Sequence, residues 1–181
     1  MKLKSLDKVL VIDVEACCWK GNPPTGMYNE IIEIGICTLD CKTKEIEDKT
    51  SIIIKPTFSE ISYFCTELTT LTPEYIEEKG IVFFDACKFI KEKFKSNTRA
   101  WFSWGDYDRT AFEKNCKLLN VQYPFRNTHF NLKTLFAIKY GLKEELGVQG
   151  ALEKIGMEFE GQQHRGDSDA YNISRILTKI L

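Results

Sequence analysis

The sequence predicts an α/β fold in which a mixed sheet of about five strands is flanked by helices. Three segments of strand length, rich in Ile and Val, follow one another near the N-terminus and indicate an antiparallel meander. The remainder of the chain carries helical patterns on either side of one further apolar segment. A meander followed by a strand between helices is typical of a mixed sheet with helical cover.

The predicted strands are short apolar segments bounded by loop residues. The first is an apolar, β-branched run that suits a central strand covered on both faces. A loop containing glycine and proline at residues 16–29 follows it, and Pro56 ends the meander. The predicted strands are residues 9–14, 30–39, 46–54 and 99–104.

Helices are predicted from capping residues and from apolar residues at helical spacing. Thr72 and Pro73 are typical of an N-cap and a first helical residue, and Gly80 is a stop signal. The other predicted helices span residues 85–94, 108–119, 132–140, 149–155 and 167–180. Because no linker, repeat or low-complexity tract divides the sequence, we expect residues 1–181 to form a single domain.

The composition limits the class of protein. A formal net charge of −1 excludes a globally basic surface of the kind that binds duplexes non-specifically, so nucleic acid would be held locally. Seven cysteines without a CxxC pair indicate reduced thiols and a cytoplasmic location. The apolar run near the N-terminus is short and interrupted by acids, which predicts neither a signal peptide nor a membrane span.

Two acids lie at the end of the first predicted strand. Asp13 and Glu15 are two residues apart, so the alternation of side chains along a strand places both on one face. An unpaired carboxylate next to a buried strand is unfavourable, which makes Asp13 the stronger candidate for a functional residue. Glu15 has an equally plausible alternative as the first residue of a polar loop, because acids at this spacing are common.

Two further acids begin the apolar stripes of predicted helices. The stripe that starts at Asp108 continues with Ala111, Phe112, Cys116 and Leu119. The stripe that starts at Asp169 continues with Ile173, Ile176, Leu177 and Ile180. For Asp108 the alternative is an acid that merely interacts well with the helix dipole. Both anomalies together with the acid pair favour one shared acidic site.

A shared site of four carboxylates requires cations. At 4 Å and an effective dielectric constant of about 20, each pair of charges repels by about 4 kcal/mol. Carboxylates without cysteine or clustered histidine suit Mg²⁺ or Mn²⁺, and two such ions can clamp both oxygens of a phosphodiester displacement. The acids therefore predict two bound Mg²⁺ or Mn²⁺ ions and phosphoryl chemistry.

The two histidines are interpreted differently. His164 lies in a polar stretch before the last predicted helix, five residues before Asp169. Since imidazole titrates near neutral pH, a histidine at this place can take a proton from an attacking water. We interpret His129 as a surface histidine without a role.

These residues together resemble the DEDDh 3′-to-5′ exonucleases, which have a ribonuclease-H-like fold. The three motifs stand in order at residues 11–18 (VIDVEACC), 103–108 (SWGDYD) and 164–169 (HRGDSD). The His-x4-Asp spacing of the third motif distinguishes this family from members that carry tyrosine instead. Residues 29–35 (NEIIEIG) and 64–72 (FCTELTTLT) are similar to the branch that acts on histone mRNA and in RNA interference.

The resemblance implies roles for individual residues. Asp13, Glu15 and Asp169 would bind the first ion, Asp13 and Asp108 the second, and His164 would be the general base. Residues implied to contact the substrate are Ala16, Phe64, Tyr107, His164 and Arg165. Asp106 and Asp167 lie beside motif acids, but the motif register and the buried stripes both favour Asp108 and Asp169. Basic candidates for holding a strand are Lys20, Lys55, Arg109, Lys133 and Arg165.

We therefore expect a metal-dependent 3′-to-5′ exonuclease that releases 5′ mononucleotides from single-stranded nucleic acid, most naturally RNA. A DNA-directed, proofreading-like exonuclease is an alternative, because no residue unambiguously recognises the ribose 2′-hydroxyl. A second alternative is a non-catalytic module of the same fold that binds RNA or protein. The expected partners are single-stranded RNA or DNA 3′ ends, with no membrane.

Overall fold

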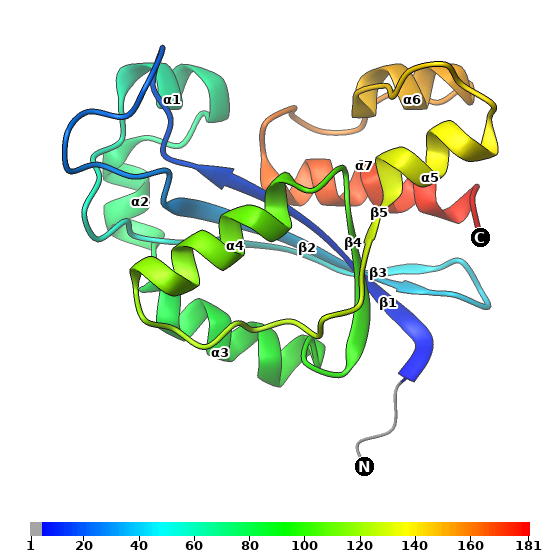
Figure 1. The fold of residues 1–181 in the computed structure, drawn as a ribbon, viewed down its shortest axis with the longest axis horizontal. Coiled ribbons are helices and arrows are strands. Elements are labelled where there is room, and N and C mark those ends of the chain that lie inside the picture. Colours follow the sequence, from blue (N-terminus) through cyan, green and yellow to red (C-terminus); the bar gives the residue numbers. More distant parts are fainter. Residues whose placement is uncertain (1–4) are drawn as a thin grey trace.

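The central strand of the sheet is β1 (Ser5–Ala16), as the computed structural model of residues 5–181 shows (Figure 1). It pairs antiparallel with β2 (Ile31–Asp40), which pairs antiparallel with β3 (Ile46–Ile53). On its other side β1 pairs parallel with β4 (Arg99–Ser103), and β4 pairs parallel with β5 (His129–Asn131). The strand order is β3-β2-β1-β4-β5, which confirms the mixed sheet and its meander.

Residues 1–4 lie outside the described part of the chain. They include the basic start of the N-terminal segment that we predict to be neither a signal peptide nor a membrane span. Among residues 5–181, no helix combines the length and apolar character needed to cross a bilayer.

All six predicted helices are present, with ends shifted by a few residues. The helices are α1 (Tyr63–Thr69), α2 (Pro73–Lys79), α3 (Phe83–Phe94), α4 (Tyr107–Leu118), α5 (Leu132–Lys139), α6 (Val148–Lys154) and α7 (Gly166–Thr178). The predicted cap of α2 is confirmed, because the Thr72 hydroxyl accepts a hydrogen bond from the Tyr75 amide.

Two elements were not predicted. Helix α1 is short and buries only Cys65 and Thr69, so it has no apolar stripe; the Ser62 cap, which accepts from the Cys65 amide, fixes its start. Strand β5 has three residues, too few for an alternating pattern, and it forms because β4 offers it a parallel edge.

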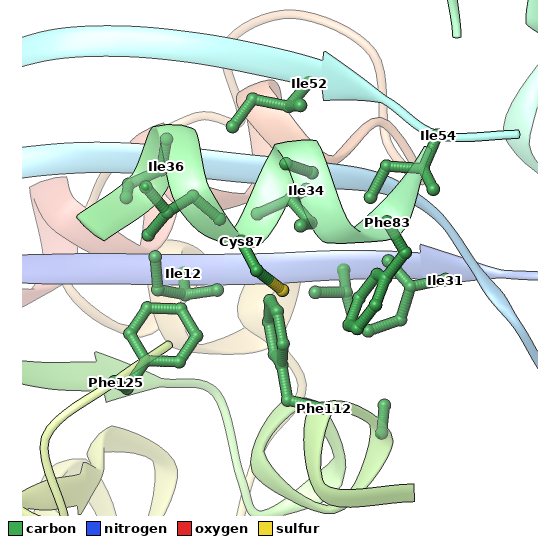
Figure 2. Close-up of a cluster of buried hydrophobic side chains, with 14 of the residues drawn as sticks. Ile12, Ile31, Ile34, Ile36, Ile52, Ile54, Phe83, Cys87, Phe112 and Phe125 are labelled. Carbon is green, nitrogen blue, oxygen red and sulfur yellow. The ribbon is translucent and has the colours of Figure 1, made fainter. Parts of the chain in front are cut away.

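Alternation along β1 assigns its side chains to two cores. Leu10, Ile12 and Val14 pack with α3 and α4 on one face, where Figure 2 shows Ile12 near Phe112 and Phe125. Val9 and Val11 lie on the other face and pack with residues of α5 and α7. The odd-numbered positions of β1 therefore face α7, and Asp13 and Glu15 continue that series.

Candidate active site

Three carboxylates meet at the carboxyl end of β1. In the β1–β2 ladder Asp13 lies opposite Gly35, and Glu15 lies opposite Glu33, just before a register shift at Ala16. Asp169, in the first turn of α7, approaches from the face that α7 covers. Carboxylate oxygens of Asp13, Glu15 and Asp169 all lie within 4.8 Å of one another. The structure thus brings together three of the four predicted acids in a group able to hold a metal ion.

A close contact between two glycines allows α7 to approach the sheet. A Cβ atom at Gly35 would lie 1.8 Å from the carbonyl oxygen of Gly166. A Cβ atom at Gly166 would lie 2.8 Å from the amide nitrogen of Gly35. The backbone of α7 therefore rests directly on the backbone of β2, which only residues without a side chain permit. This contact sets the distance between Asp169 and the acids of β1.

Asp108 is attached to β1 by its own hydrogen bond. Its Oδ1 accepts from the Val14 amide at 2.9 Å, and the residue is only 4% exposed. The neighbouring acid Asp106 lies outside this group: it is about half exposed and pairs with Arg109 at 2.9 Å. Asp108 is therefore the acid of the second motif that joins the β1 acids.

The alternative acid in the third motif is also paired outside the group. Asp167 Oδ2 lies 3.4 Å from the Lys49 ammonium on β3. Asp169 instead accepts a hydrogen bond from the Arg165 amide at 3.1 Å and belongs to the three-acid group. The geometry agrees with the register that the motif and the buried stripe favour.

Burial and mutual repulsion raise the pKa values of all four acids. Burial raises the pKa of Asp13 well above its usual range, and Asp108 and Asp169 raise it further. Burial, with a contribution from Asp169, raises the pKa of Glu15 to about 8. The pKa of Asp108 rises to about 7 through burial, against the lowering effect of the Val14 hydrogen bond. Burial raises the pKa of Asp169 to about 6, against its hydrogen bond from the backbone. Such a site has a strong electrostatic preference for a cation.

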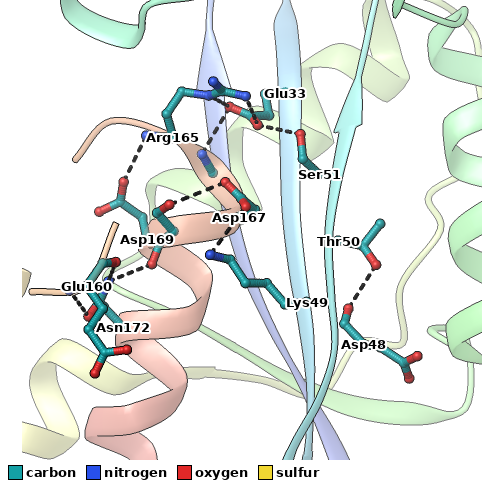
Figure 3. A network of polar contacts seen from close by, with 12 residues as sticks. Glu33, Asp48, Lys49, Thr50, Ser51, Glu160, Arg165, Asp167, Asp169 and Asn172 are labelled. Atoms are coloured by element: carbon teal, nitrogen blue, oxygen red, sulfur yellow. Dashed lines mark hydrogen bonds and ion pairs between the residues drawn. The ribbon is translucent and has the colours of Figure 1, made fainter. Parts of the chain in front are cut away.

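His164 lies in the loop just before α7, and its exposed side chain stands on a backbone with φ of 59°. The next residue, Arg165, makes two hydrogen bonds to the buried Glu33 carboxylate, from Nε at 3.0 Å and from Nη2 at 3.1 Å (Figure 3). Glu33 also accepts from the Gly166 amide at 3.0 Å and from the Ser51 hydroxyl. We call these four residues the Glu33 clasp. The clasp fixes the chain immediately after His164.

Glu33 was not predicted as a site residue, although the sequence carries a signal. It stands within the apolar run IIEIGI, where an acid is as unusual as Asp13 is in β1. In the structure Glu33 is fully buried, and its carboxylate accepts the first free amide of α7. The clasp therefore also satisfies a donor at the helix N-terminus that lacks a partner within the helix.

The exonuclease family RNase_T matches residues 10–177, nearly the whole chain. The chain belongs to this exonuclease family. The DEDDh resemblance and the ribonuclease-H-like fold predicted from the sequence are both confirmed. Exonucleases of this family use divalent metal ions, and two observations fit that cofactor here: the 4.8 Å clustering of carboxylate oxygens and their raised pKa values.

The relatives of this chain include proteins named as exoribonucleases. The 3'-5' exoribonuclease 1 of Homo sapiens is 30% identical over 187 residues, which cover 97% of this chain and 52% of that protein. The solved nuclease domain of 3'hExo, a DEDDh family member bound to rAMP, has a TM-score of 0.87 at 28% identity, covering 96% of this chain and 91% of that chain. A structure described as 3'-end specific recognition of histone mRNA stem-loop by 3'-exonuclease has a TM-score of 0.87 at 29% identity, covering 96% and 81%. The chain spans about half the length of the exoribonuclease 1 relatives that it matches.

The interpretation of His129 as a surface residue was wrong. Its side chain is 5% exposed, its ring packs on Trp101 with centroids 4.3 Å apart, and Nε2 lies 2.8 Å from the Ser103 hydroxyl. Burial, with Arg109 nearby, lowers its pKa to about 4, so the ring is neutral at neutral pH. Burial raises the pKa of Asp108, and an interaction with Ser103 lowers it. His129 thus helps to support the acid site. This role could not be predicted, because β5, the strand that carries His129, is too short to show a pattern.

The residues predicted to contact substrate surround the carboxyl end of β1 in this exonuclease fold. Cys65 Sγ donates to the carbonyl oxygen of Ala16 at 3.6 Å, which places α1 and the partly exposed Phe64 beside the strand end. Tyr107, the first residue of α4, is 58% exposed and precedes Asp108. Two exposed aromatic rings thus stand on elements that border the acids.

Most of the predicted basic residues are engaged in ion pairs. Lys20 is exposed in the loop after β1. The other four pair with acids: Lys55 with Glu77, Arg109 with Asp106, Lys133 with Glu145 and Arg165 with Glu33. A role of these residues in holding a nucleic acid strand stays a prediction.

Proposed function

We propose that this chain is a divalent-metal-dependent 3′-to-5′ exonuclease that removes 5′ mononucleotides from single-stranded RNA. One observation carries the proposal: acids from β1, α4 and α7 converge at one strand end, with a histidine loop clasped beside them. The names of its relatives, which are exoribonucleases, support RNA as the substrate.

The acids divide naturally between two ions. We assign Asp13, Glu15 and Asp169 to a first Mg²⁺ or Mn²⁺, because their oxygens form the close group. Asp108, buried beside β1, would hold a second ion together with Asp13. When bound, the ions supply Lewis-acid stabilisation of the charge that develops on the phosphodiester oxygens. Without a cation, burial and mutual repulsion raise the pKa values of these carboxyl groups, so they are partly protonated near neutral pH.

His164 is assigned the proton transfer. A nitrogen of its exposed imidazole takes the proton of the attacking water, because carboxylates that are bound to cations are poor bases. The Glu33 clasp holds the loop, so the ring needs little reorganisation to reach the water.

Binding of the 3′ end is assigned to two exposed aromatic rings and to the guanidinium group of Arg165. Phe64 and Tyr107 offer faces on which terminal bases stack regardless of sequence, and Ala16 provides the small residue at the strand end. Arg165 uses Nε and Nη2 for Glu33, which leaves Nη1 for a phosphate.

The test compares variants of the acids on a 5′-labelled single-stranded RNA with Mg²⁺ or Mn²⁺. Asp108→Asn and His164→Ala should lose cleavage, whereas Asp106→Asn and Asp167→Asn, matched acids outside the group, should keep most of it. Loss of activity in the control variants as well would contradict the assigned register. Circular RNA should resist cleavage, and its digestion would indicate an endonuclease.

The preference for RNA is tested separately with matched RNA and DNA oligonucleotides. Faster turnover of RNA supports the assignment. Equal turnover would contradict it and favour a DNA-directed or indiscriminate exonuclease, and binding without cleavage under any metal would favour the non-catalytic module.

We also propose a reducing, cytoplasmic setting. All seven cysteines are free thiols, five of them buried, so the fold needs no disulfide. Imaging of the tagged protein in cells tests the compartment, and a location in the secretory pathway would contradict it.

We further propose that residues 1–181 form a single domain. One sheet runs through the described chain and helices from both halves cover it. A single cooperative unfolding transition that coincides in near-UV and far-UV circular dichroism is expected, and two separate transitions would contradict it.

A further inference from the structure

A cavity of about 620 Å³ lies between the β1–β2 loop and the outer face of α4. We call it the α4 pocket. Residues that define it are Met27, Tyr28, Tyr107, Ala111, Lys114 and Lys117. Its volume is in the range of sites that hold a small organic group such as a nucleoside. Of the residues assigned above to the acids, the general base and the 3′ end, the lining shares only Tyr107.

The walls of the α4 pocket are held by hydrogen bonds of the protein itself. Asn115, buried on α4, accepts from the Ile31 amide at 3.0 Å and donates to the Asn29 carbonyl at 3.2 Å. The Ser59 hydroxyl bonds both to the Tyr28 amide and to the Tyr28 carbonyl, each at 2.8 Å. The C-terminal end of the loop is therefore fixed both to α4 and to the segment before α1. A pocket formed in this way is ready for a ligand without rearrangement.

The chemistry of the lining combines aromatic rings with positive charge. Tyr28 is 46% exposed and Tyr107 is 58% exposed, so both offer ring surface. Lys114 and Lys117 are exposed, three residues apart on α4, and neither is in an ion pair within residues 5–181. The described lining contains no carboxylate. Rings for stacking beside unpaired cations are the usual means of holding a single strand of nucleic acid.

Tyr107 borders the α4 pocket and also lies near the acids of the site. This residue lines the pocket, and the next residue in the chain is Asp108, whose carboxylate faces β1. A strand whose 3′ end reaches the acids thus has a path along α4 into the pocket. Nucleotides that lie 5′ of the scissile bond would follow that path.

We propose that the α4 pocket binds a nucleotide upstream of the 3′ end, with its base against Tyr28 and its flanking phosphates near Lys114 and Lys117. The proposal rests on the proposed exonuclease function, because the acid site defines where the 3′ end lies. The affinity should therefore depend on the length of the strand: an oligonucleotide that reaches the pocket binds more tightly than a dinucleotide that does not.

The test measures binding without cleavage. Fluorescence anisotropy follows a 5′-labelled single-stranded RNA of about eight nucleotides in EDTA, with the wild-type chain, the double variant Lys114→Gln with Lys117→Gln, and Tyr28→Ala. A matched control carries Lys42→Gln with Lys88→Gln, two exposed lysines that do not line the pocket. Both double variants change the net charge equally.

The pocket variants should differ from the control in two measurements. Loss of two phosphate contacts should lower the slope of log K against log salt by about 1.4, since each contact to a single strand contributes about 0.7. Tyr28→Ala should weaken binding about five-fold or more through lost stacking. With Mn²⁺, the same variants should raise KM for the longer RNA and leave hydrolysis of a dinucleotide unchanged.

Three results would overturn the proposal: no RNA binding by the wild-type chain, unchanged affinity and salt slope in the double variant, or equal losses in the control. If the pocket variants weaken binding but no metal supports cleavage, the pocket stands and the proposed exonuclease function fails. The two ideas are thus tested independently.

Discussion

Replacing Glu15 by Gln should stabilise the metal-free protein at pH 8. Burial, with Asp169 and Glu33 adding repulsion, raises the pKa of Glu15 from 4.5 to about 8. Each pKa unit corresponds to about 1.36 kcal/mol, so the ionised side chain destabilises the fold by at most about 5 kcal/mol. Screening by solvent at this half-buried position reduces the expected gain to about 2 kcal/mol.

The sign of the pH dependence follows from the proton balance. Because the pKa of the Glu15 carboxyl is higher in the folded state, folding binds a proton between about pH 4.5 and pH 8. The free energy of unfolding of the wild-type protein should therefore fall as the pH rises through this window. Glu15→Gln removes this contribution, so its stability should fall less steeply, and the two proteins should converge near pH 4.5.

Thermal unfolding in EDTA and in Mn²⁺ measures both effects. For a chain of this size, about 2 kcal/mol corresponds to a rise in Tm of about 4–8 °C for the variant in EDTA at pH 8. Mn²⁺ should reverse the order, because binding to the native state stabilises the wild type more than a variant that lacks one ligand. Glu92→Gln, an exposed acid on α3, is the control and should change neither value. A variant less stable than wild type in EDTA at pH 8, or equal stabilisation of both proteins by Mn²⁺, would contradict a destabilising charge at Glu15.

Three further substitutions test the supports of the site. Gly35→Ala should lower the free energy of unfolding by about 1–3 kcal/mol and weaken Mn²⁺ stabilisation, because its Cβ would meet the backbone of α7 at 1.8 Å. Denaturant unfolding with and without metal checks this, and a neutral effect would contradict the close contact. Glu33→Gln leaves Arg165 without its charge partner and should lower the free energy of unfolding by about 3 kcal/mol. In steady-state kinetics it should lower kcat more than it raises KM, and a change in KM alone would count against a positioning role. Ser103→Ala removes an interaction that lowers the pKa of Asp108, so Mn²⁺ binding should be weaker at pH 6 than at pH 8 by a larger factor than in wild type. Calorimetric titrations at the two pH values check this, and an unchanged pH dependence would exclude the contribution.

The chemistry-bearing acids could be predicted because their signals are local. Asp13 breaks an apolar strand, and Asp108 and Asp169 each begin an apolar helical stripe, so each acid contradicts its own pattern. Element type followed from the same periodicities, which is why the meander and most helices are present as predicted.

The residues that support the acids could not be predicted in this way, because their partners are distant in sequence. Glu33 is joined to Arg165 across 132 positions, and His129 is joined to Ser103 through β5, a strand too short to show a pattern. The contact between Gly35 and Gly166 depends on how α7 packs on β2, which no local pattern contains.

The most direct measurement is a time course of 5′-labelled single-stranded RNA with Mn²⁺ or Mg²⁺, resolved at single-nucleotide length, with EDTA as the metal-free control. The proposed function predicts a ladder that shortens progressively from the 3′ end, releases 5′ mononucleotides and disappears in EDTA. Intact RNA under every metal, or internal cleavage products that appear first, would contradict the claim that these converging acids form an exonuclease site.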